Sequence, residues 1–194
     1  MKFDNNKTCN DYLNHHTLLY GETNTKKTFY TAKFVQFLIE SNFNPLDITI
    51  LDIAPKMVII NDLKIGGRIN DFYEKSEACN NLLFTGEIIP PRLQAQDPEE
   101  LILYARNNFI KANQILEEYA QNSTPILIIN DISIYLHVGK VKHLLNLINK
   151  ARTFFGNTYY GTSINSNFTH EFSLNEKELV ESLVEKIEYS YSTD

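Results

Sequence analysis

Cysteine is scarce in this sequence, and long apolar runs are absent. The 194 residues include only two cysteines, Cys9 and Cys79. They lie far apart and match no metal-binding spacing, so we expect free thiols in a reducing compartment. No apolar run approaches the ~20 residues that span a bilayer, and residues 1–6 lack the apolar core of a secretory signal. These absences predict a cytoplasmic protein without a membrane partner.

Positive charge is also in short supply. The chain carries 18 lysines and arginines against 24 aspartates and glutamates, which gives a formal net charge of −6. This balance weighs against a broad nucleic-acid surface, and no stretch interleaves basic with aromatic residues. We therefore do not expect a nucleic-acid partner. Repeats, low-complexity tails and linkers are lacking too, so the length suits one domain, with residues 1–14 as an N-terminal extension.

Segments typical of strands alternate with segments typical of helices along the chain. We expect strands at residues 17–20, 47–53, 82–85, 126–129 and 158–162, and helices at residues 28–41, 97–120, 141–152 and 174–190. The continuous apolar run at 126–129 is typical of a strand buried on both faces of a parallel sheet. Asp97 and Ser173 are candidate helix caps. Residues 56–81 fit a helix, a hairpin or a loop.

This alternation predicts an α/β fold, a three-layer α/β/α sandwich with a mostly parallel sheet covered on both faces. In such sheets, ligands bind beyond the carboxyl ends of the strands. The most informative stretch of the sequence, residues 21–28 (GETNTKKT), lies at such an end. It follows the first expected strand and opens the first expected helix.

Residues 21–28 have nearly the spelling of a phosphate-binding loop, G-x-x-x-x-G-K-[ST]. Backbone N–H groups in a tight turn and the positive end of the following helix attract phosphate. Lys27 is placed to reach the outer phosphates, and Thr28 to bind Mg²⁺. One letter differs, because Lys26 stands where the second glycine is expected. The plainer alternative is a polar strand-to-helix connection with a chance lysine pair.

A second motif follows the buried apolar run, which leads into Asn130 and Asp131. An aspartate at the end of such a strand holds Mg²⁺, directly or through water, in phosphate-binding proteins of this type. Alone the signal is weak, since many strands end in an aspartate that caps the next turn. Behind the loop at 21–28, it predicts a magnesium site shared by Thr28 and Asp131.

The two motifs together resemble the P-loop NTPase superfamily, with its Walker A loop and Walker B strand. The strand candidates between them resemble the additional-strand branch, which includes RecA-like and AAA-like ATPases. The resemblance covers the core of the chain and implies the P-loop NTPase fold, with ATP or GTP and Mg²⁺ as cofactors. It assigns Thr28 and Asp131 to the metal, a catalytic role to Lys27, and cofactor binding to Gly21, Glu22, Thr23, Asn24, Thr25, Lys26, Lys27 and Thr28.

Two departures from the family pattern concern activity. At Lys26 the backbone must approach phosphate closely, so this side chain either crowds the phosphate or turns outward, depending on its φ angle. The second departure is that Ile132, and no glutamate, follows Asp131. A substitute base must then come from elsewhere.

The candidates for that base are Glu22 in the loop and Glu87 after the strand at 82–85, with Asp52 as a third. Each has a plainer interpretation as a loop or strand-end carboxylate. Arg68 and Arg92 are candidate phosphate contacts, in cis or as arginine fingers. Thr162 or Ser163, at the end of the expected strand 158–162, is a candidate sensor of the terminal phosphate, although a tyrosine-rich strand needs no such role.

Three functions follow as expectations. The first is an ATP- or GTP-binding protein with slow ATPase activity. The second is a degenerate, non-catalytic P-loop domain that acts as a regulatory or interaction module. The third is a kinase of a small molecule or nucleotide. A protein partner or a homo-oligomer is expected by analogy with other parallel α/β domains.

Overall fold

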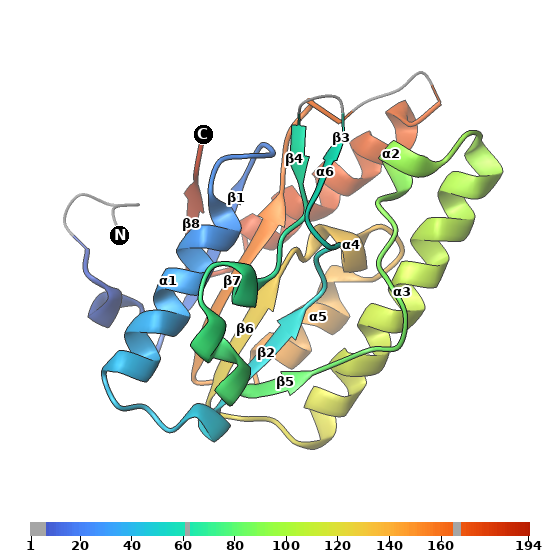
Figure 1. The fold of residues 1–194 in the computed structure, drawn as a ribbon. Coiled ribbons are helices and arrows are strands. Elements are labelled where there is room, and N and C mark those ends of the chain that lie inside the picture. Colours follow the sequence, from blue (N-terminus) through green and yellow to red (C-terminus); the bar gives the residue numbers. More distant parts are fainter. Residues whose placement is uncertain (1–6, 61–62, 165–167) are drawn as a thin grey trace.

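A six-stranded parallel sheet organises the fold (Figure 1). The computed structural model describes residues 7–60, 63–164 and 168–194. The strand order in the sheet is β5-β2-β6-β7-β1-β8, and every pairing is parallel. The strands are β1 (His16–Gly21), β2 (Ile48–Asp52), β5 (Asn80–Leu82), β6 (Ile126–Asn130), β7 (Thr153–Tyr159) and β8 (Tyr189–Ser192).

Helices cover both faces of this sheet. One face carries α1 (Lys27–Glu40), and the other carries α3 (Pro98–Gln121), α5 (Val141–Ile148) and α6 (His170–Val184). Figure 1 shows α1 in front of the sheet and α5 behind it. Shorter elements complete the description: α2 (Pro91–Gln94), α4 (Ser133–Leu136), the hairpin β3 (Val58–Ile60) and β4 (Leu63–Ile65), and the 3₁₀ turns η1 (Cys9–Tyr12), η2 (Pro45–Asp47), η3 (Ile69–Asp71) and η4 (Glu74–Ala78). The expected three-layer sandwich is confirmed.

The apolar run of β6 contributes to both cores. Leu127 and Ile129 pack in the cluster with α3, α5 and α6, whereas Ile126 and Ile128 pack in the cluster with α1. Neighbouring side chains of a strand point to opposite faces, and both faces of β6 are covered. The continuous apolar sequence is thereby explained.

Two expected strands are displaced. The strand expected at 82–85 is β5 (Asn80–Leu82), and the one expected at 158–162 is β7 (Thr153–Tyr159). Every residue of β7 is buried. The strand therefore lies inside the sheet over residues 153–159, and the tyrosines of the expected strand lie at its carboxyl end. The expected helix 141–152 is correspondingly shorter and ends at Ile148.

The C-terminal segment also differs from expectation. The helix expected at 174–190 is α6 (His170–Val184), with Thr169 rather than Ser173 at its N-terminal boundary. The residues beyond it form β8, which pairs in parallel with β1. A four-residue edge strand with alternating tyrosine and serine has too little apolar sequence to stand out from a helical tail, which is why the pattern missed it.

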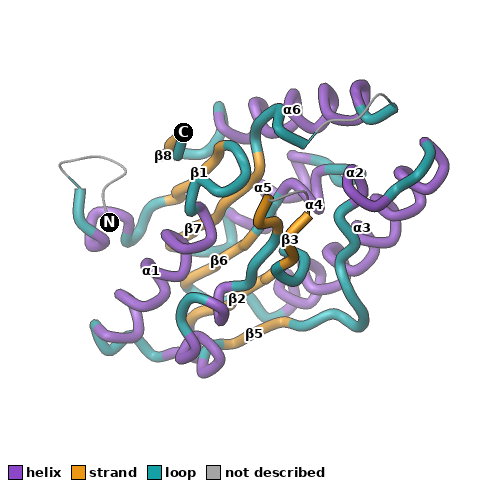
Figure 2. The backbone as a smooth tube through the Cα atoms, turned by 45° about the horizontal axis from the view of Figure 1, so that its top comes forward, coloured by secondary structure: helices purple, strands orange, loops and turns teal. Residues whose placement is uncertain are grey.

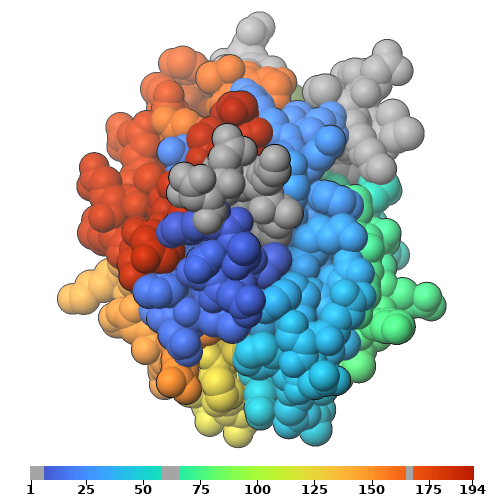
Figure 3. Space-filling model, turned by 90° about the vertical axis from the view of Figure 1, so that its left-hand side faces the viewer, coloured from blue at the N-terminus to red at the C-terminus, as the bar shows by residue number. Residues whose placement is uncertain are grey.

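Part of the N-terminal segment packs on the body of the protein. Figure 3 shows its residues in dark blue between α1 and the red C-terminal segment. The Tyr12 side chain is fully buried, and its ring lies edge-on to Phe34, Phe155 and Tyr191 at centroid distances of 6.3, 5.6 and 6.1 Å. Aromatic pairs of this geometry stabilise a fold by about 0.5–1.5 kcal/mol each. Residues 1–6 lie outside the described part.

The strand order brings the two sequence motifs to one edge of the sheet. Because all six strands run the same way, the loops after β1, β2, β6 and β7 share the carboxyl edge (Figure 2). One strand, β7, lies between β1, which leads into residues 21–28, and β6, which leads into Asp131. An interposed strand is what the additional-strand resemblance implies, and the expected α/β fold with a parallel sheet is confirmed. Within the described residues, no helix is long and apolar enough to cross a membrane.

Candidate functional site

A cavity of about 450 Å³ opens at the carboxyl edge of the sheet. Its walls come from the loop 23–29, from residues that follow β2 and β6, from the carboxyl end of β7, and from α2. The polar and charged side chains among the lining residues are Thr23, Asn24, Thr25, Lys26, Lys27, Thr28, Arg92, Asp131, Ser133, His137, Asn157 and Tyr159. The sequence motifs and the cavity therefore coincide.

The loop 21–28 has the backbone of a turn built around left-handed residues. Gly21 has φ +153°, and a Cβ there would lie 2.6 Å from Thr193 Oγ1, so only glycine fits. Asn24 and Lys26 have φ angles of 61° and 65°. A glycine would adopt the Lys26 conformation without strain. Lys26 adopts it as an exposed residue that also lines the cavity.

The backbone N–H groups in this loop remain available. Within the described residues, no hydrogen bond has an N–H group of residues 24–28 as its donor. The N–H of Glu22 is used, because it donates to Asp194 Oδ1 at 2.8 Å. Successive free N–H groups at a helix N-terminus form a concave site for an anion.

Lys27 lies inside the loop. Its ammonium donates to the carbonyl oxygens of Gly21, at 2.8 Å, and Glu22, and to Thr25 Oγ1 at 3.3 Å. Burial lowers the pKa of Lys27 to about 8, although the carboxylates of Asp131, Asp194 and Glu22 oppose the shift. Within the described residues, the hydrogen bonds of this half-buried cation all go to carbonyl and hydroxyl oxygens, which a phosphate oxygen could replace.

Thr28 points toward the end of β6, as expected, but it contacts Asn130 rather than Asp131. The Thr28 hydroxyl donates to Asn130 Oδ1 at 3.1 Å. Asn157 of β7 donates to the same oxygen at 2.8 Å and to Thr31 Oγ1 at 2.9 Å. These hydrogen bonds join α1, β6 and β7 beneath the loop.

The orientation of the Asn130 amide is fixed on its other side. Its Nδ2 donates to Asp52 Oδ1 at 2.7 Å and to the Gly67 carbonyl at 3.0 Å, so Oδ1 faces Thr28. Asp52 Oδ2 accepts from the Ile69 N–H at 2.7 Å. Burial raises the pKa of Asp52 to about 6 despite these hydrogen bonds. Asp52 thus supports Asn130 from below and is not among the cavity-lining residues.

Asp131 follows Asn130 with φ 63° and lines the cavity. Its N–H donates to Asn157 Oδ1 at 3.1 Å, and its Oδ1 accepts from the Ser133 hydroxyl at 2.7 Å. Burial raises the pKa of the Asp131 carboxyl, which the Ser133 hydrogen bond and the Lys27 ammonium oppose. Among the described lining residues, Asp131 is the only carboxylate.

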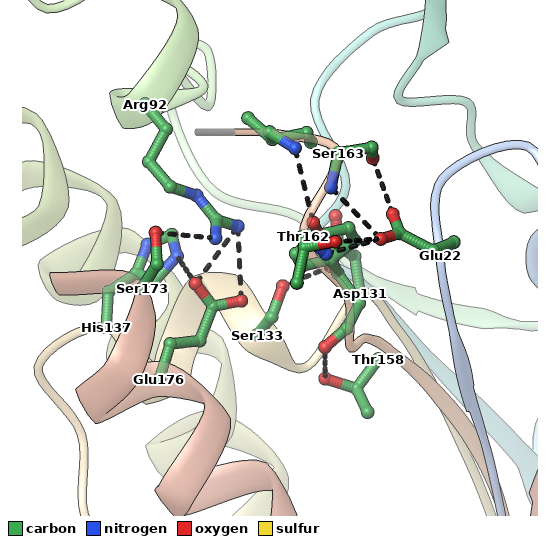
Figure 4. Close-up of polar contacts among 12 residues, drawn as sticks. Glu22, Arg92, Asp131, Ser133, His137, Thr158, Thr162, Ser163, Ser173 and Glu176 are labelled. Carbon is green, nitrogen blue, oxygen red and sulfur yellow. Dashed lines mark hydrogen bonds and ion pairs between the residues drawn. The ribbon is translucent and has the colours of Figure 1, made fainter. Parts of the chain in front are cut away.

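Glu22 and the expected sensor residues contact each other instead of the cavity. The Glu22 carboxylate accepts from the N–H groups of Thr162 and Ser163 and from the Ser163 hydroxyl (Figure 4). Burial disfavours the Glu22 anion, but these donors outweigh it and lower its pKa. The hydrogen bonds tie the start of the loop to the segment after β7.

Two other sequence candidates lie away from the cavity lining. Glu87 pairs with Lys56 at 2.6 Å, and its side chain is 66% exposed. The Arg68 backbone N–H donates to Asp71, and its buried side-chain Nε has no hydrogen-bond partner within the described residues. Neither residue is brought to the loop 21–28, so the structure assembles Lys27, Thr28 and Asp131 but not Glu87 or Arg68.

Arg92 does line the cavity, as part of a buried ion pair. Its guanidinium lies 3.0 Å from Glu176 Oε2, and His137 Nε2 lies 3.1 Å from the same oxygen. The side chains of Arg92, Glu176 and His137 are 7%, 3% and 1% exposed. Arg92 also packs over the Tyr159 ring, 4.7 Å from its centroid. Figure 4 shows Arg92 directed at Glu176, with Ser173 beside it. These contacts connect α2, α6 and His137, which directly follows α4, along one wall of the cavity.

Comparisons with known proteins found similar structures at low sequence identity. No protein-family model and no curated protein matches the sequence. The chain is similar to the flagellar accessory protein FlaH from Methanocaldococcus jannaschii, with 12% identity and a TM-score of 0.44, over 84% of this chain and 68% of FlaH. It is also similar to a chain in the structure of Drosophila ORC bound to GC-rich DNA and Cdc6, with 13% identity and a TM-score of 0.27, over 93% of this chain and 50% of that one. At these scores the likenesses carry no argument about function.

Sequence reasoning missed several residues of the site. Asn157 lies inside a strand whose position was wrong, and Asn130 was read only as the neighbour of Asp131. His137 and Glu176 are 39 positions apart and meet only through the fold. The signal that could have found Asn130 and Asn157 is a polar residue inside a buried strand. Asparagine is depleted in strands, and a buried amide needs hydrogen-bond partners.

Proposed function

We propose that this protein binds a nucleoside triphosphate with Mg²⁺ and hydrolyses it slowly. The observation that supports this most directly is the backbone of residues 24–28, with two left-handed residues, an exposed Lys26, and N–H groups that have no acceptor within the described residues. Such a loop binds phosphate through its backbone. Lys26 has the left-handed φ of 65° that a glycine at this position of the motif would readily adopt, which supports the proposal.

Each residue of the loop end has a role in this proposal. The β- and γ-phosphates lie on the N–H groups of residues 24–28, and the Lys27 ammonium moves from the loop carbonyls to the outer phosphates. Bound phosphate stabilises the cationic form of Lys27 more strongly than neutral oxygens do. In this proposal the bound phosphate takes the place of the Lys27 ammonium inside the loop.

The donors around Thr28 fit a hard cation. Thr28 Oγ1 and Asn130 Oδ1 lie 3.1 Å apart, and Asp131 supplies the carboxylate. Mg²⁺ prefers such oxygen ligands and is typically bound by one or two carboxylates together with substrate phosphates. Within the described residues there is no cluster of three or more His, Cys, Asp or Glu that would form a separate metal site. We assign Thr28 and, through water, Asp131 to Mg²⁺, which would neutralise charge on the γ-phosphate.

A non-catalytic nucleotide-responsive module is the second candidate. An uncharged amide, Asn130, faces Thr28, and the buried Ile132 follows Asp131. A site with one carboxylate has less capacity both to hold Mg²⁺ and to orient the attacking water. Turnover distinguishes the two candidates. The kinase alternative and an oligomeric assembly remain expectations from the sequence.

Isothermal titration with Mg-ATP and Mg-GTP tests binding. We expect one site, a loss of about tenfold or more in affinity for Lys27→Ala, as for removal of a charged hydrogen bond, and wild-type affinity for the exposed control Lys33→Ala. Absence of heat in both the natural protein and Lys26→Gly would rule the proposal out. Phosphate release that is lost in Lys27→Ala favours the hydrolase, and tight binding without release favours the module.

A further inference from the structure

The three carboxylates that the sequence suggests as catalytic bases lie outside the cavity lining. Glu22, Glu87 and Asp52 are not among the described residues that line the cavity. The Glu22 carboxylate accepts instead from the segment after β7. The buried Ile132 stands where a glutamate would follow Asp131, and Asp131 itself is assigned to Mg²⁺. A base for the proposed hydrolysis therefore has to come from another residue of the cavity wall.

His137 is the lining residue with the chemistry of a base. Imidazole is the side chain whose ordinary pKa lies closest to neutral pH. His137 lines the cavity and directly follows α4, with its side chain 1% exposed. Its backbone N–H donates to the Ser133 carbonyl at 3.1 Å, so the two residues are one helical turn apart and share a face. Ser133 in turn donates to Asp131 Oδ1 at 2.7 Å.

The electrostatics of Asp131 bring Lys27 and His137 near the same carboxylate. Burial raises the pKa of Asp131, whereas the Ser133 hydrogen bond and the charge of Lys27 lower it. The charge of Glu176 raises this pKa as well, and that of His137 lowers it. Such effects weaken with distance. His137 therefore lies close to Asp131, as Lys27 does.

The His137 ring is held so that one nitrogen remains free to accept. Nε2 lies 3.1 Å from Glu176 Oε2 (Figure 4), and because a carboxylate only accepts, Nε2 carries the hydrogen and Nδ1 has the lone pair. Arg92 balances the charge of Glu176 across 3.0 Å, so a neutral imidazole leaves this buried cluster without net charge. The Phe172 ring packs on His137 with a centroid distance of 4.7 Å. Nδ1 is buried and has no hydrogen-bond partner within the described residues, and a buried acceptor needs a donor.

We propose that His137 is the general base of the hydrolysis and that Glu176 is its positioning residue. Nδ1 accepts a hydrogen bond from the water that attacks the γ-phosphate. The water oxygen bonds to the γ-phosphorus, and the bond from that phosphorus to the β,γ-bridging oxygen breaks, leaving its electron pair on the diphosphate. One proton of the water goes to Nδ1, and Glu176 stabilises the imidazolium until that proton passes to solvent. The inference rests on the proposed function and names the base of that same site.

A matched pair of histidine variants tests the role of His137. His137→Gln keeps an N–H donor for Glu176 but has no basic nitrogen. His143→Gln is the control, because His143 also pairs with a glutamate, Glu117, at 3.0 Å, but is 39% exposed and outside the described cavity lining. Phosphate release at saturating Mg-ATP measures kcat. Titration with a non-hydrolysable ATP analogue measures nucleotide affinity and shows that each variant is folded.

We expect His137→Gln to lower kcat by about 100-fold or more, as for loss of a general base. Its nucleotide affinity should stay within about threefold of that of the natural protein, and His143→Gln should match the natural protein in both measurements. An unchanged kcat in His137→Gln would overturn the proposal. A loss of affinity as large as the loss of kcat would overturn it too, because His137 would then act in nucleotide binding.

Chemical rescue separates a base from a packing residue, and it supplies a second variant if His137→Gln does not fold. His137→Ala is assayed with added imidazole and with 1,2,4-triazole, which has nearly the same size but is a much weaker base. We expect imidazole to restore part of the turnover and triazole to restore far less. Equal effects of the two azoles would contradict a role as base.

Failure of the proposed function has a different signature from failure of this inference. A natural protein that binds no nucleotide, or that binds it without releasing phosphate, would rule out the hydrolase and its base together. Turnover that persists undiminished in His137→Gln would rule out the base alone.

Discussion

The Thr28 hydroxyl donates its hydrogen bond to Asn130 and not to Asp131. Asn130 in turn donates to Asp52 across 2.7 Å. Because Asp52 accepts from the Asn130 Nδ2, the Asn130 Oδ1 is the atom that faces Thr28. The side chain next to the Thr28 hydroxyl is therefore neutral, and Asp131 is the only carboxylate among the described residues that line the cavity.

Asn130→Asp tests this arrangement. The new carboxylate would lie beside Asp52, so the pair resists double ionisation and the folded-state pKa rises above the unfolded value of about 3.9. Stability is then present at low pH and lost as pH rises. We expect the variant to be less stable than the natural protein by about 2 kcal/mol at pH 7 and by much less at pH 4. Urea unfolding measures this, with the exposed Asn149→Asp as control. Equal losses at both pH values would contradict the charge argument.

Asp52 itself makes the natural protein sensitive to pH. Its folded-state pKa is about 6, above the unfolded value of about 3.9. The folded state thus binds more protons, and stability falls as pH rises from about 4 to 6. The full effect is of the order of 3 kcal/mol. Asp52→Asn should flatten the stability profile in this window, whatever its absolute stability. A profile parallel to that of the natural protein would show that Asp52 does not titrate there.

Lys26 is strained in the left-handed region at φ 65°. Lys26→Gly should raise the free energy of unfolding by about 0.5–1 kcal/mol, after allowance for the more flexible unfolded chain. The same substitution at Lys33, exposed within α1, should lower it by about 1 kcal/mol. Chemical denaturation of the two variants measures both signs. Destabilisation by Lys26→Gly would mean that the lysine side chain contributes to the loop.

The fold class was predictable because it depends on periodicity. The buried apolar run of β6, the cap at Asp97 and the glycine of the loop each indicate local structure without knowledge of the rest. The strand at 153–159 was expected too late in the chain because Gly156 and Asn157, residue types that are depleted in strands, interrupt its apolar sequence. β8 was missed because an edge strand of four residues has little apolar signal.

The sequence predicted only those site residues that lie next to a recognisable local pattern. Lys27 and Thr28 lie in a contiguous loop, and Asp131 follows a recognisable strand. The contacts that organise these residues join distant segments. Asn130 meets Asp52 across 78 positions, and Asn157 meets Thr31 across 126. Such pairings depend on strand order, which single-sequence patterns do not specify.

The ion pair of Arg92 and Glu176 gives a last prediction, about the wall of the cavity. Their side chains are 7% and 3% exposed, and removal of one partner from a buried pair leaves an uncompensated charge. Arg92→Met should therefore cost about 3–5 kcal/mol of folding stability. Arg92→Met combined with Glu176→Gln should recover most of it, because glutamine is neutral and can still bond to His137. Thermal and urea unfolding of the single and double variants measure the coupling.

Lys56→Met, which breaks the exposed pair with Glu87, is the control and should behave as a neutral surface substitution. Equal losses for the single and the double variant would show that Arg92 acts through packing on Tyr159 rather than through its charge.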